Sequence, residues 1–254
     1  MDVSFPDQVV LITGASTGIG AALAKAFGAA AARVVVHYHH SAEAAQTVAN
    51  DIGTGGGAAL VVQADLQDAT QLEAVVTQTL DHFGRIDILI NNAGSLVQRQ
   101  TVADMNDDTF QAIMDLNMTA VFRMCRQVIP IMRRQGNGTI INVSSIAGRN
   151  GGAGGSVIYA TSKGAVATFT RGLAKELAGD GIRVNALAPG VILTPFHERF
   201  TDAERMDAMV RTIPMGRAGT PEECVGAVFF LASERMSGYV TGQVIEVNGG
   251  QLMP

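Results

Sequence analysis

The sequence predicts a doubly wound α/β fold, in which helices cover both faces of a seven-stranded parallel sheet. Seven short runs rich in β-branched residues are the strand candidates: 9–13, 33–37, 59–63, 86–91, 139–144, 182–188 and 243–248. Most of these runs are apolar at nearly every position, as expected when both faces of a parallel sheet are buried. Longer alanine-rich stretches of helical period separate them. This alternation is typical of the doubly wound class.

A single domain is expected over residues 1–254. The chain has 47% hydrophobic and 16% charged residues, and no linker-like segment interrupts the alternation, so one large domain is favoured over two small ones. Helix signals agree with this reading. Thr220, Pro221 and Glu223 have the spacing of an N-cap, a first helical residue and a capping box. Asp107 or Asp108 is the expected start of a long helix that reaches about Gln135.

Composition and charge exclude several classes of partner. The formal net charge of −5 lacks the basic footprint that nucleic-acid binding needs. The N-terminal MDVSFPDQ has no secretory pattern, and no apolar run is long enough to span a bilayer, so we expect a cytoplasmic protein that binds no membrane. Cys125 and Cys224 are far apart and are expected to be free, buried thiols. Three histidines at 37, 39 and 40 lack a carboxylate or thiol at ligand spacing, so no metal site is expected.

The segment TGASTGIG at 13–20 follows the first predicted strand directly. Gly14, Gly18 and Gly20 remove side chains from the turn, and the N–H groups that open the expected helix at 18–31 would face an anion. A tight turn without a ligand is the alternative for the glycines alone. Their place after the first strand of an alternating series favours a Rossmann dinucleotide site.

The segment YATSK at 159–163 places Tyr159 and Lys163 one turn apart on one face of an expected helix. An exposed surface pair is the plain alternative. A free phenol with a pKa near 10 is a poor base at neutral pH. Lys163 and the helix N-terminus would favour the phenolate, and so would an oxidised nicotinamide if the glycine turn at 13–20 binds a dinucleotide of that kind. Together we expect them to lower the pKa of Tyr159 by about 3 units, or roughly 4 kcal/mol.

Four motifs, taken in their order along the chain, resemble those of one protein family. TGASTGIG, NNAG at 91–94, YATSK and NALAPG at 185–190 resemble the motifs of the classical short-chain dehydrogenase/reductases. The likeness covers nearly the whole chain and extends to reductases of 3-oxoacyl-[acyl-carrier-protein]. It implies an enzyme with EC class 1.1.1 chemistry, which moves a hydride between a nicotinamide and a carbonyl or alcohol carbon. It also implies a homotetramer.

The resemblance assigns catalytic roles residue by residue. Tyr159 is the implied acid/base, and Lys163 lowers its pKa and holds the nicotinamide ribose. Ser145 hydrogen-bonds the reacting oxygen, as an oxyanion-hole donor would, while Ser144 points elsewhere because neighbouring strand residues alternate. Asn117 helps to hold a water beside Lys163. The alternatives left open are that both serines cap the strand end and that Asn117 makes only structural bonds.

Cofactor contacts follow from the same resemblance. The implied residues are Gly14, Ser16, Thr17, Gly18, Ile19, Gly20, His37, Tyr38, Ser41, Asp65, Leu66, Asn92, Ala93, Gly94, Tyr159, Lys163, Pro189, Gly190, Ile192 and Thr194. An acidic residue after the second strand would select NAD by holding the ribose 2′-hydroxyl, but His37 and Tyr38 stand there. His39, His40 or Ser41 could instead meet a 2′-phosphate. We therefore expect NADP(H) over NAD(H), although Thr17 stands where many NADP-using relatives have Arg or Lys. Asp65 is implied at the adenine amino group, with capping of the next helix as a compatible role.

The substrate is read only in outline. The implied pocket walls are Leu96, Val97, Ile146, Val157, Ile192, Phe196 and Met206, which indicate a moderately apolar pocket, and the charged candidates nearby are Arg99, Arg149, His197, Glu198 and Arg199. The glycine-rich 150–155 loop is slightly longer than usual, which leaves the pocket's shape open. Reduction of a ketone or 3-oxo compound is favoured. The alternatives are an NAD(H)-dependent sugar or steroid alcohol dehydrogenase, or a non-catalytic NAD(P) sensor.

Overall fold

A computed structural model describes residues 3–253, so residues 1–2 and 254 of the predicted domain lie outside it. It contains the predicted seven-stranded parallel sheet, and the strand order is β3-β2-β1-β4-β5-β6-β7. The strands are β1 (Val9–Ile12), β2 (Arg33–Tyr38), β3 (Ala58–Gln63), β4 (Ile88–Asn91), β5 (Gly138–Val143), β6 (Ile182–Pro189) and β7 (Val244–Val247). The predicted strand bounds are correct to within about two residues.

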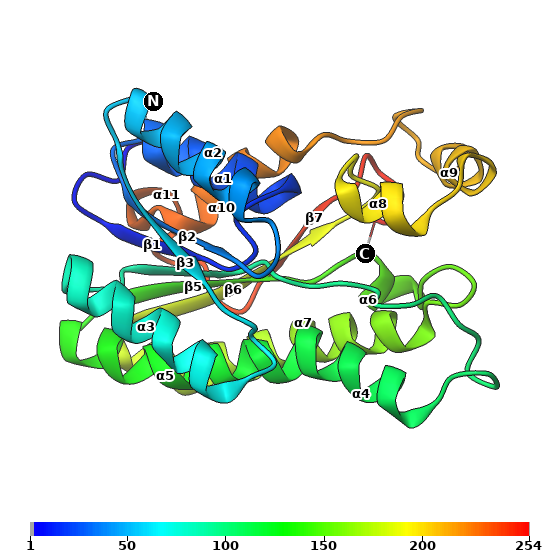
Figure 1. The fold of residues 1–254 in the computed structure, drawn as a ribbon, viewed down its shortest axis with the longest axis horizontal. Coiled ribbons are helices and arrows are strands. Elements are labelled where there is room, and N and C mark those ends of the chain that lie inside the picture. The colour runs from blue at the N-terminus through cyan, green and yellow to red at the C-terminus, as the bar shows by residue number, and fades with distance from the viewer. Residues whose placement is uncertain (1–2, 254) are drawn as a thin grey trace.

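Helices cover both faces of the sheet (Figure 1). One face carries α1 (Gly18–Ala29), α2 (Ala42–Thr54) and α10 (Val225–Ala232), and the other carries α3 (Ala69–Phe83), α5 (Ala120–Gln135) and α7 (Val157–Leu177). The shorter helices are α4 (Asp107–Met114), α6 (Ala147–Asn150), α8 (Pro195–Phe200), α9 (Ala203–Val210) and α11 (Glu234–Ser237), with 3-10 turns at Ala178–Asp180 and Pro221–Cys224. Two apolar clusters, one on each face, make up the core.

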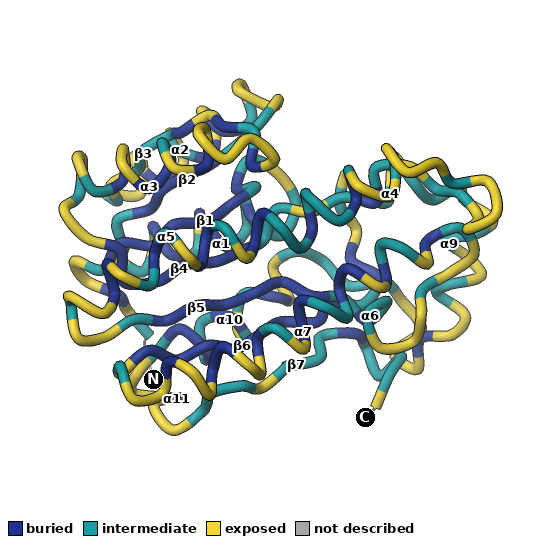
Figure 2. Tube along the Cα trace, turned by 90° about the horizontal axis from the view of Figure 1, so that it is seen from below, coloured by how far each residue is buried: buried dark blue, intermediate teal, exposed yellow. Residues whose placement is uncertain are grey.

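Every residue of the central strands β1, β4 and β6 is buried, as is every residue of β5 except Gly138, which explains why their sequences do not alternate. The edge strands β3 and β7 are only partly covered. Figure 2 shows this difference and shows α4, α6 and α9 beyond one end of the sheet. That end holds the carboxyl ends of the strands, because α6 follows β5 directly.

Segment 107–135 is not the single helix that was predicted. It begins at Asp107, as expected, and Asn106 is the N-cap, with Oδ1 accepting from the Thr109 N–H at 2.8 Å. A π-helical turn at Asp115–Thr119 then separates α4 from α5. π-turns interrupt the regular i→i−4 bonds and are frequent at functional sites, and this one contains the predicted site residue Asn117.

Other local predictions agree with the structure. The capping box of Thr220 and Glu223 is present, and both cysteines are free and buried. Helix α1 ends at Ala29, two residues earlier than expected. Across residues 3–253, no helix combines the length and apolar character needed to cross a membrane.

Candidate active site

A cavity of about 620 Å³ lies at the carboxyl end of the sheet. The strand order reverses between β1 and β4, and ligands of doubly wound sheets bind where such a reversal opens a crevice. The predicted residues that line the cavity are Gly14, Ser16, Thr17, Gly18, Ile19, His37, Asp65, Leu66, Asn92, Ala93, Gly94, Ser145, Tyr159, Lys163, Pro189, Gly190, Ile192 and Thr194. The predicted residues Gly20, Tyr38, Ser41 and Asn117 are not among the lining residues.

The glycine turn between β1 and α1 has the backbone shape that its sequence predicts. Gly14 and Gly18 have φ angles of +63° and +54°, which side chains rarely adopt. A Cβ on Gly20 would lie 2.1 Å from the Gly14 carbonyl oxygen, so Gly20 allows the turn to close without touching the cavity. The helix has no acidic residue in its first turn and no side-chain cap at Thr17. Its first N–H groups are therefore available to an anion.

Two polar side chains fix this turn against the end of β4. The Thr13 hydroxyl accepts hydrogen bonds from the N–H groups of Asn92 and Ala93 at 2.9 and 3.0 Å. The Asn92 amide donates in return to the carbonyl oxygens of Thr13 and Gly14. Thr13 was not among the predicted site residues, although it stands first in TGASTGIG.

His37 lines the cavity but is buried, with 2% exposed surface. Its Nδ1 accepts from the Gly14 N–H at 3.0 Å, and its Nε2 lies 3.1 Å from the Ala64 carbonyl oxygen. These partners require the neutral Nε2–H tautomer. Burial lowers the pKa of His37 to about 4. His37 therefore positions the glycine turn, and since it also lines the cavity, the predicted cofactor contact stays a prediction.

Two predicted cofactor residues lie away from the cavity. Tyr38 is the last residue of β2. Its side chain packs against the core cluster beneath α1 and α2. Ser41 is exposed at the start of α2 and makes no side-chain cap. His39 reaches the cavity instead. Its ring stacks on that of His40 with centroids 3.6 Å apart.

Asp65 follows β3 and faces His39, with its Oδ2 3.9 Å from His39 Nε2. Asp65 Oδ1 accepts from the Gln67 N–H. The alternative role of Asp65 as the cap of the next helix is wrong, because Asp68 caps α3 through the N–H groups of Thr70 and Gln71. The Asp65 carboxylate remains part of the cavity wall.

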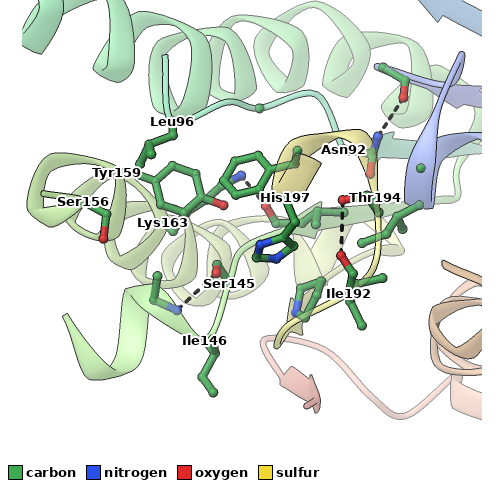
Figure 3. A pocket seen from close by; sticks show the side chains of 18 of the residues that line it. Asn92, Leu96, Ser145, Ile146, Ser156, Tyr159, Lys163, Ile192, Thr194 and His197 are labelled. Carbon is green, nitrogen blue, oxygen red and sulfur yellow. Dashed lines mark hydrogen bonds between the residues drawn. The ribbon is translucent and has the colours of Figure 1, made fainter. Parts of the chain in front are cut away.

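The predicted reacting residues lie together at the other end of the cavity (Figure 3). Tyr159 and Lys163 stand on the first turns of α7, and Ser145 follows β5. Lys163 Nζ lies 5.8 Å from the centroid of the Tyr159 ring and donates to the Val143 carbonyl oxygen at 2.8 Å. Lys163 is buried, with 3% exposed surface, and it lies beside the Tyr159 ring. The pair is therefore not the exposed surface pair that was the alternative for YATSK.

The electrostatics of this pair differ from the prediction. Burial raises the pKa of Tyr159 to about 12, and the neighbouring Ser145 side chain opposes this rise in part. Burial also lowers the pKa of Lys163 to about 8. The expected depression of the tyrosine pKa is absent in the protein alone, because burial of the phenol outweighs the hydrogen bond of Ser145.

The two serines divide as predicted. Ser144 Oγ donates to the Lys163 carbonyl oxygen at 2.8 Å, and so ties β5 to α7. Ser145 Oγ accepts from the Ala147 N–H at 3.1 Å, which leaves its own hydroxyl hydrogen available. This hydrogen can be donated to the Tyr159 oxygen, and that hydrogen bond lowers the pKa of Tyr159 in part.

Asn117 is fully buried in the π-helical turn. Its amide Nδ2 donates to the carbonyl oxygens of Ser95 and Ile113, both at 2.8 Å, and Oδ1 accepts from the Ser95 N–H at 3.1 Å. This side chain ties the loop after β4 to the helix layer, which is the structural alternative left open. The water implied beside Lys163 stays a prediction.

The substrate end is only partly predicted. Leu96, Ile146, Ile192 and Phe196 line the cavity with the charged candidates Arg99 and His197, but the other candidates Val97, Arg149, Val157, Glu198, Arg199 and Met206 do not. The sequence analysis missed Ser156, Arg205, Met209, Thr212 and Gln251. Most of these missed residues lie more than ten positions after the NALAPG motif, where no motif marks them.

The fold and this cavity define a class: a nicotinamide-dinucleotide oxidoreductase that acts on a carbonyl or alcohol carbon. A family model described as enoyl-(acyl carrier protein) reductase matches residues 14–251. The chain is 42% identical to a 3-oxoacyl-[acyl-carrier-protein] reductase of Synechocystis sp., over 97% of each chain. It is 39% identical to 3beta-hydroxysteroid dehydrogenase 1 of Eggerthella lenta, over 97% of this chain and 94% of that one. A crystal structure of a short-chain type dehydrogenase/reductase from Mycobacterium marinum has a TM-score of 0.93 and 39% identity, with 100% of this chain and 98% of that chain covered. The protein belongs to the short-chain dehydrogenase/reductase family, whose members use NAD(P)(H).

Proposed function

We propose that the protein is an NADPH-dependent reductase that converts a ketone or 3-oxo compound into a secondary alcohol, with Tyr159 as the proton donor. One observation carries this proposal. Tyr159, Ser145 and Lys163 line the same cavity as the glycine turn at the start of α1. A dinucleotide that lies on the turn thus extends toward a phenol, a hydroxyl and an ammonium group.

The cavity walls suit such a cofactor. The N–H groups at the start of α1 would hold the diphosphate, Lys163 the nicotinamide ribose, Thr194 the carboxamide, and Asp65 the adenine. A Cβ on Gly94 would lie 2.7 Å from Asn117 Oδ1 and 3.0 Å from Lys163 Nζ. Only glycine therefore lets the backbone pass this close to Lys163. The bound reduced nicotinamide supplies the hydride.

The chain's own residues manage the oxygen of the substrate. As the carbonyl carbon gains a hydride, its oxygen takes the phenolic proton of Tyr159 and accepts a hydrogen bond from Ser145. The raised pKa of Tyr159, about 12, means that this proton is present at neutral pH. Lys163 then faces the resulting phenolate and stabilises it. A neutral phenol favours reduction, because oxidation would need the phenolate first.

The preference for NADPH rests on the end of β2. No carboxylate of β2 lines the cavity, and His39 does. A protonated His39 would attract a 2′-phosphate, whereas an acid at this position would repel it. NADH use is the second candidate, since Ser41 lies away from the cavity and Thr17 brings no charge.

The reaction is tested by following NADPH oxidation with a panel of ketones, 3-oxo esters and thioesters. Tyr159→Phe should lower kcat by about 10³-fold, the scale of general acid catalysis, and leave the Kd for NADPH within about twofold in calorimetry. Tyr239→Phe is the matched control, because Tyr239 is fully exposed. Turnover retained by Tyr159→Phe would refute the proton-donor role. Tight cofactor binding without turnover of any carbonyl would refute the reductase proposal.

Cofactor choice needs its own experiment. The ratio of kcat/KM with NADPH to that with NADH should exceed one in the natural protein and fall by about tenfold or more in His39→Asp, because the new carboxylate repels the 2′-phosphate. His82→Asp, at an exposed position on α3, is the control. A ratio below one in the natural protein would support the NADH alternative.

A further inference from the structure

The substrate end of the cavity is lined by three basic side chains, Arg99, His197 and Arg205. Asp65 is the one acidic residue among the described lining residues. It follows β3, whereas Ser145 follows β5, and the sheet places β2, β1 and β4 between those two strands. The reacting end therefore combines apolar walls with positive charge that no lining carboxylate balances.

Arg99 is held rigidly above this end. Its Nη1 donates to the Gly154 carbonyl oxygen at 2.7 Å and its Nε to the Phe200 carbonyl oxygen at 3.3 Å, so it joins the 150–155 loop to α8. Gly155 makes room for it, since a Cβ there would lie 2.8 Å from Arg99 Cγ. The two bonds leave Nη2 available within the described part of the chain. A guanidinium fixed in this way is ready to bind an anion.

Arg205 on α9 lines the same cavity as Arg99 and is near enough to repel it. Its backbone N–H is capped by Asp202, but no ion pair holds its side chain among residues 3–253. Burial lowers the pKa of Arg99, and the repulsion of Arg205 adds to this, while Asp202 opposes it. Two guanidinium groups that repel each other inside a cavity gain from an anion between them.

His197 connects this basic pair with the reacting residues. The ring centroid of Phe196 lies 5.6 Å from that of Tyr159 and 5.4 Å from that of His197. Figure 3 shows His197 in the same space as Tyr159 and Ser145. Burial and the nearby Arg99 lower the pKa of His197, so at neutral pH its ring is a neutral hydrogen-bonding group and the arginines carry the charge.

We propose that the substrate carries an anionic group, a carboxylate or a phosphate, which Arg99 and Arg205 bind while its carbonyl lies at Tyr159 and Ser145. This inference rests on the proposed reductase function and narrows its substrate class. Either anion suits a pair of guanidinium groups, because both present the oxygen pairs that arginine binds.

The kinetic test compares charged and neutral partners of one 3-oxo group. Acetoacetate offers a carboxylate and acetoacetyl-coenzyme A offers phosphates, while ethyl acetoacetate and the N-acetylcysteamine thioester are their neutral counterparts. At least one charged member should have the higher kcat/KM. Arg205→Met should raise KM for that member by about tenfold or more, as expected for a lost charge-assisted bond, and leave its neutral counterpart within about twofold.

Arg211→Met is the matched control, because Arg211 is exposed at the end of the same helix and does not line the cavity. Equal kcat/KM for charged and neutral members, or equal losses for both in Arg205→Met, would overturn the inference while the reductase function stands. A preference for acetoacetate over its ester indicates a carboxylate, and a preference for acetoacetyl-coenzyme A over the N-acetylcysteamine thioester indicates a phosphate.

A binding measurement separates the two proposals. Calorimetry titrates the NADPH-loaded protein, which cannot oxidise an alcohol, with 3-hydroxybutyrate and its methyl ester, and with 4′-phosphopantetheine and pantetheine. An anion that binds more tightly than its neutral partner, and loses this advantage in Arg205→Met, supports the anion site even if no carbonyl is reduced. No advantage for either anion would overturn it.

Discussion

Acidification should destabilise this fold through His37. In the folded protein its pKa is about 4, because it is buried, and the unfolded chain has the ordinary value near 6.5. The unfolded state therefore binds more protons between these values. The stabilising contribution of the neutral ring is complete above pH 6.5 and is lost as the pH falls toward 4.

The size of the effect follows from these two values. The full loss below pH 4 is about 3.4 kcal/mol, and about 2 kcal/mol of it is lost by pH 5. A protonated ring also cannot accept the Gly14 N–H. Protonation of His37 should therefore destabilise the glycine turn first.

Urea unfolding at pH 7, 6 and 5 measures this contribution. His37→Asn replaces the ring by an amide that does not titrate. At each pH we compare the free energy of unfolding of the natural protein with that of the variant. The advantage of the natural protein should be about 2 kcal/mol smaller at pH 5 than at pH 7. His82→Asn, at an exposed position, should keep the natural pH response. A constant difference between the natural protein and His37→Asn would refute the reasoning.

Three further outcomes are expected. Gly20→Ala places a Cβ 2.1 Å from the Gly14 carbonyl oxygen and should weaken NADPH binding at least about tenfold, whereas Gly172→Ala, with nothing near its Cβ, should leave binding unchanged in the same calorimetry. Reduction, followed as kcat/KM against pH, should decline as the pH rises through about 8, where Lys163 loses its proton; a flat profile up to pH 10 would contradict this role for the ammonium group. Arg183→Met removes a buried guanidinium that bonds to Thr139, Ser237 and two carbonyl oxygens, and should lower the free energy of unfolding by about 3 kcal/mol in urea titration, with the exposed Arg211→Met near zero.

The sheet could be predicted from the sequence because strands that are buried on both faces consist of short apolar runs without alternation. A strand such as β1 is a continuous apolar run in the sequence, and the glycine turn follows it directly. The π-helical turn at 115–119 was not predictable in this way. Helical period alone does not report an extra residue in a turn, and the bonds that stabilise it come from Ser95, far away in the sequence.

The site was predictable where chemistry is confined to short motifs. Ser145, Tyr159 and Lys163 were found because each lies in or beside a motif. Tyr38 and Ser41 do not line the cavity, whereas the neighbouring His39 does, because the path of the backbone after β2 decides which of these side chains reaches it. Arg205 was missed because no motif surrounds it, and only the folded structure shows that α9 lies beside the cavity. The homotetramer and the cytoplasmic location stay predictions.

The two ends of the cavity differ in how they are built. The reacting end rests on strand termini and on α7, with Asn117 tying the loop after β4 to the layer beneath. The substrate end consists of loops and the short helices α8 and α9, and Arg99 joins the 150–155 loop to α8. Mutations can therefore change which molecules are accepted without moving the groups that carry out the reduction. A scaffold divided in this way can acquire new substrates in small evolutionary steps.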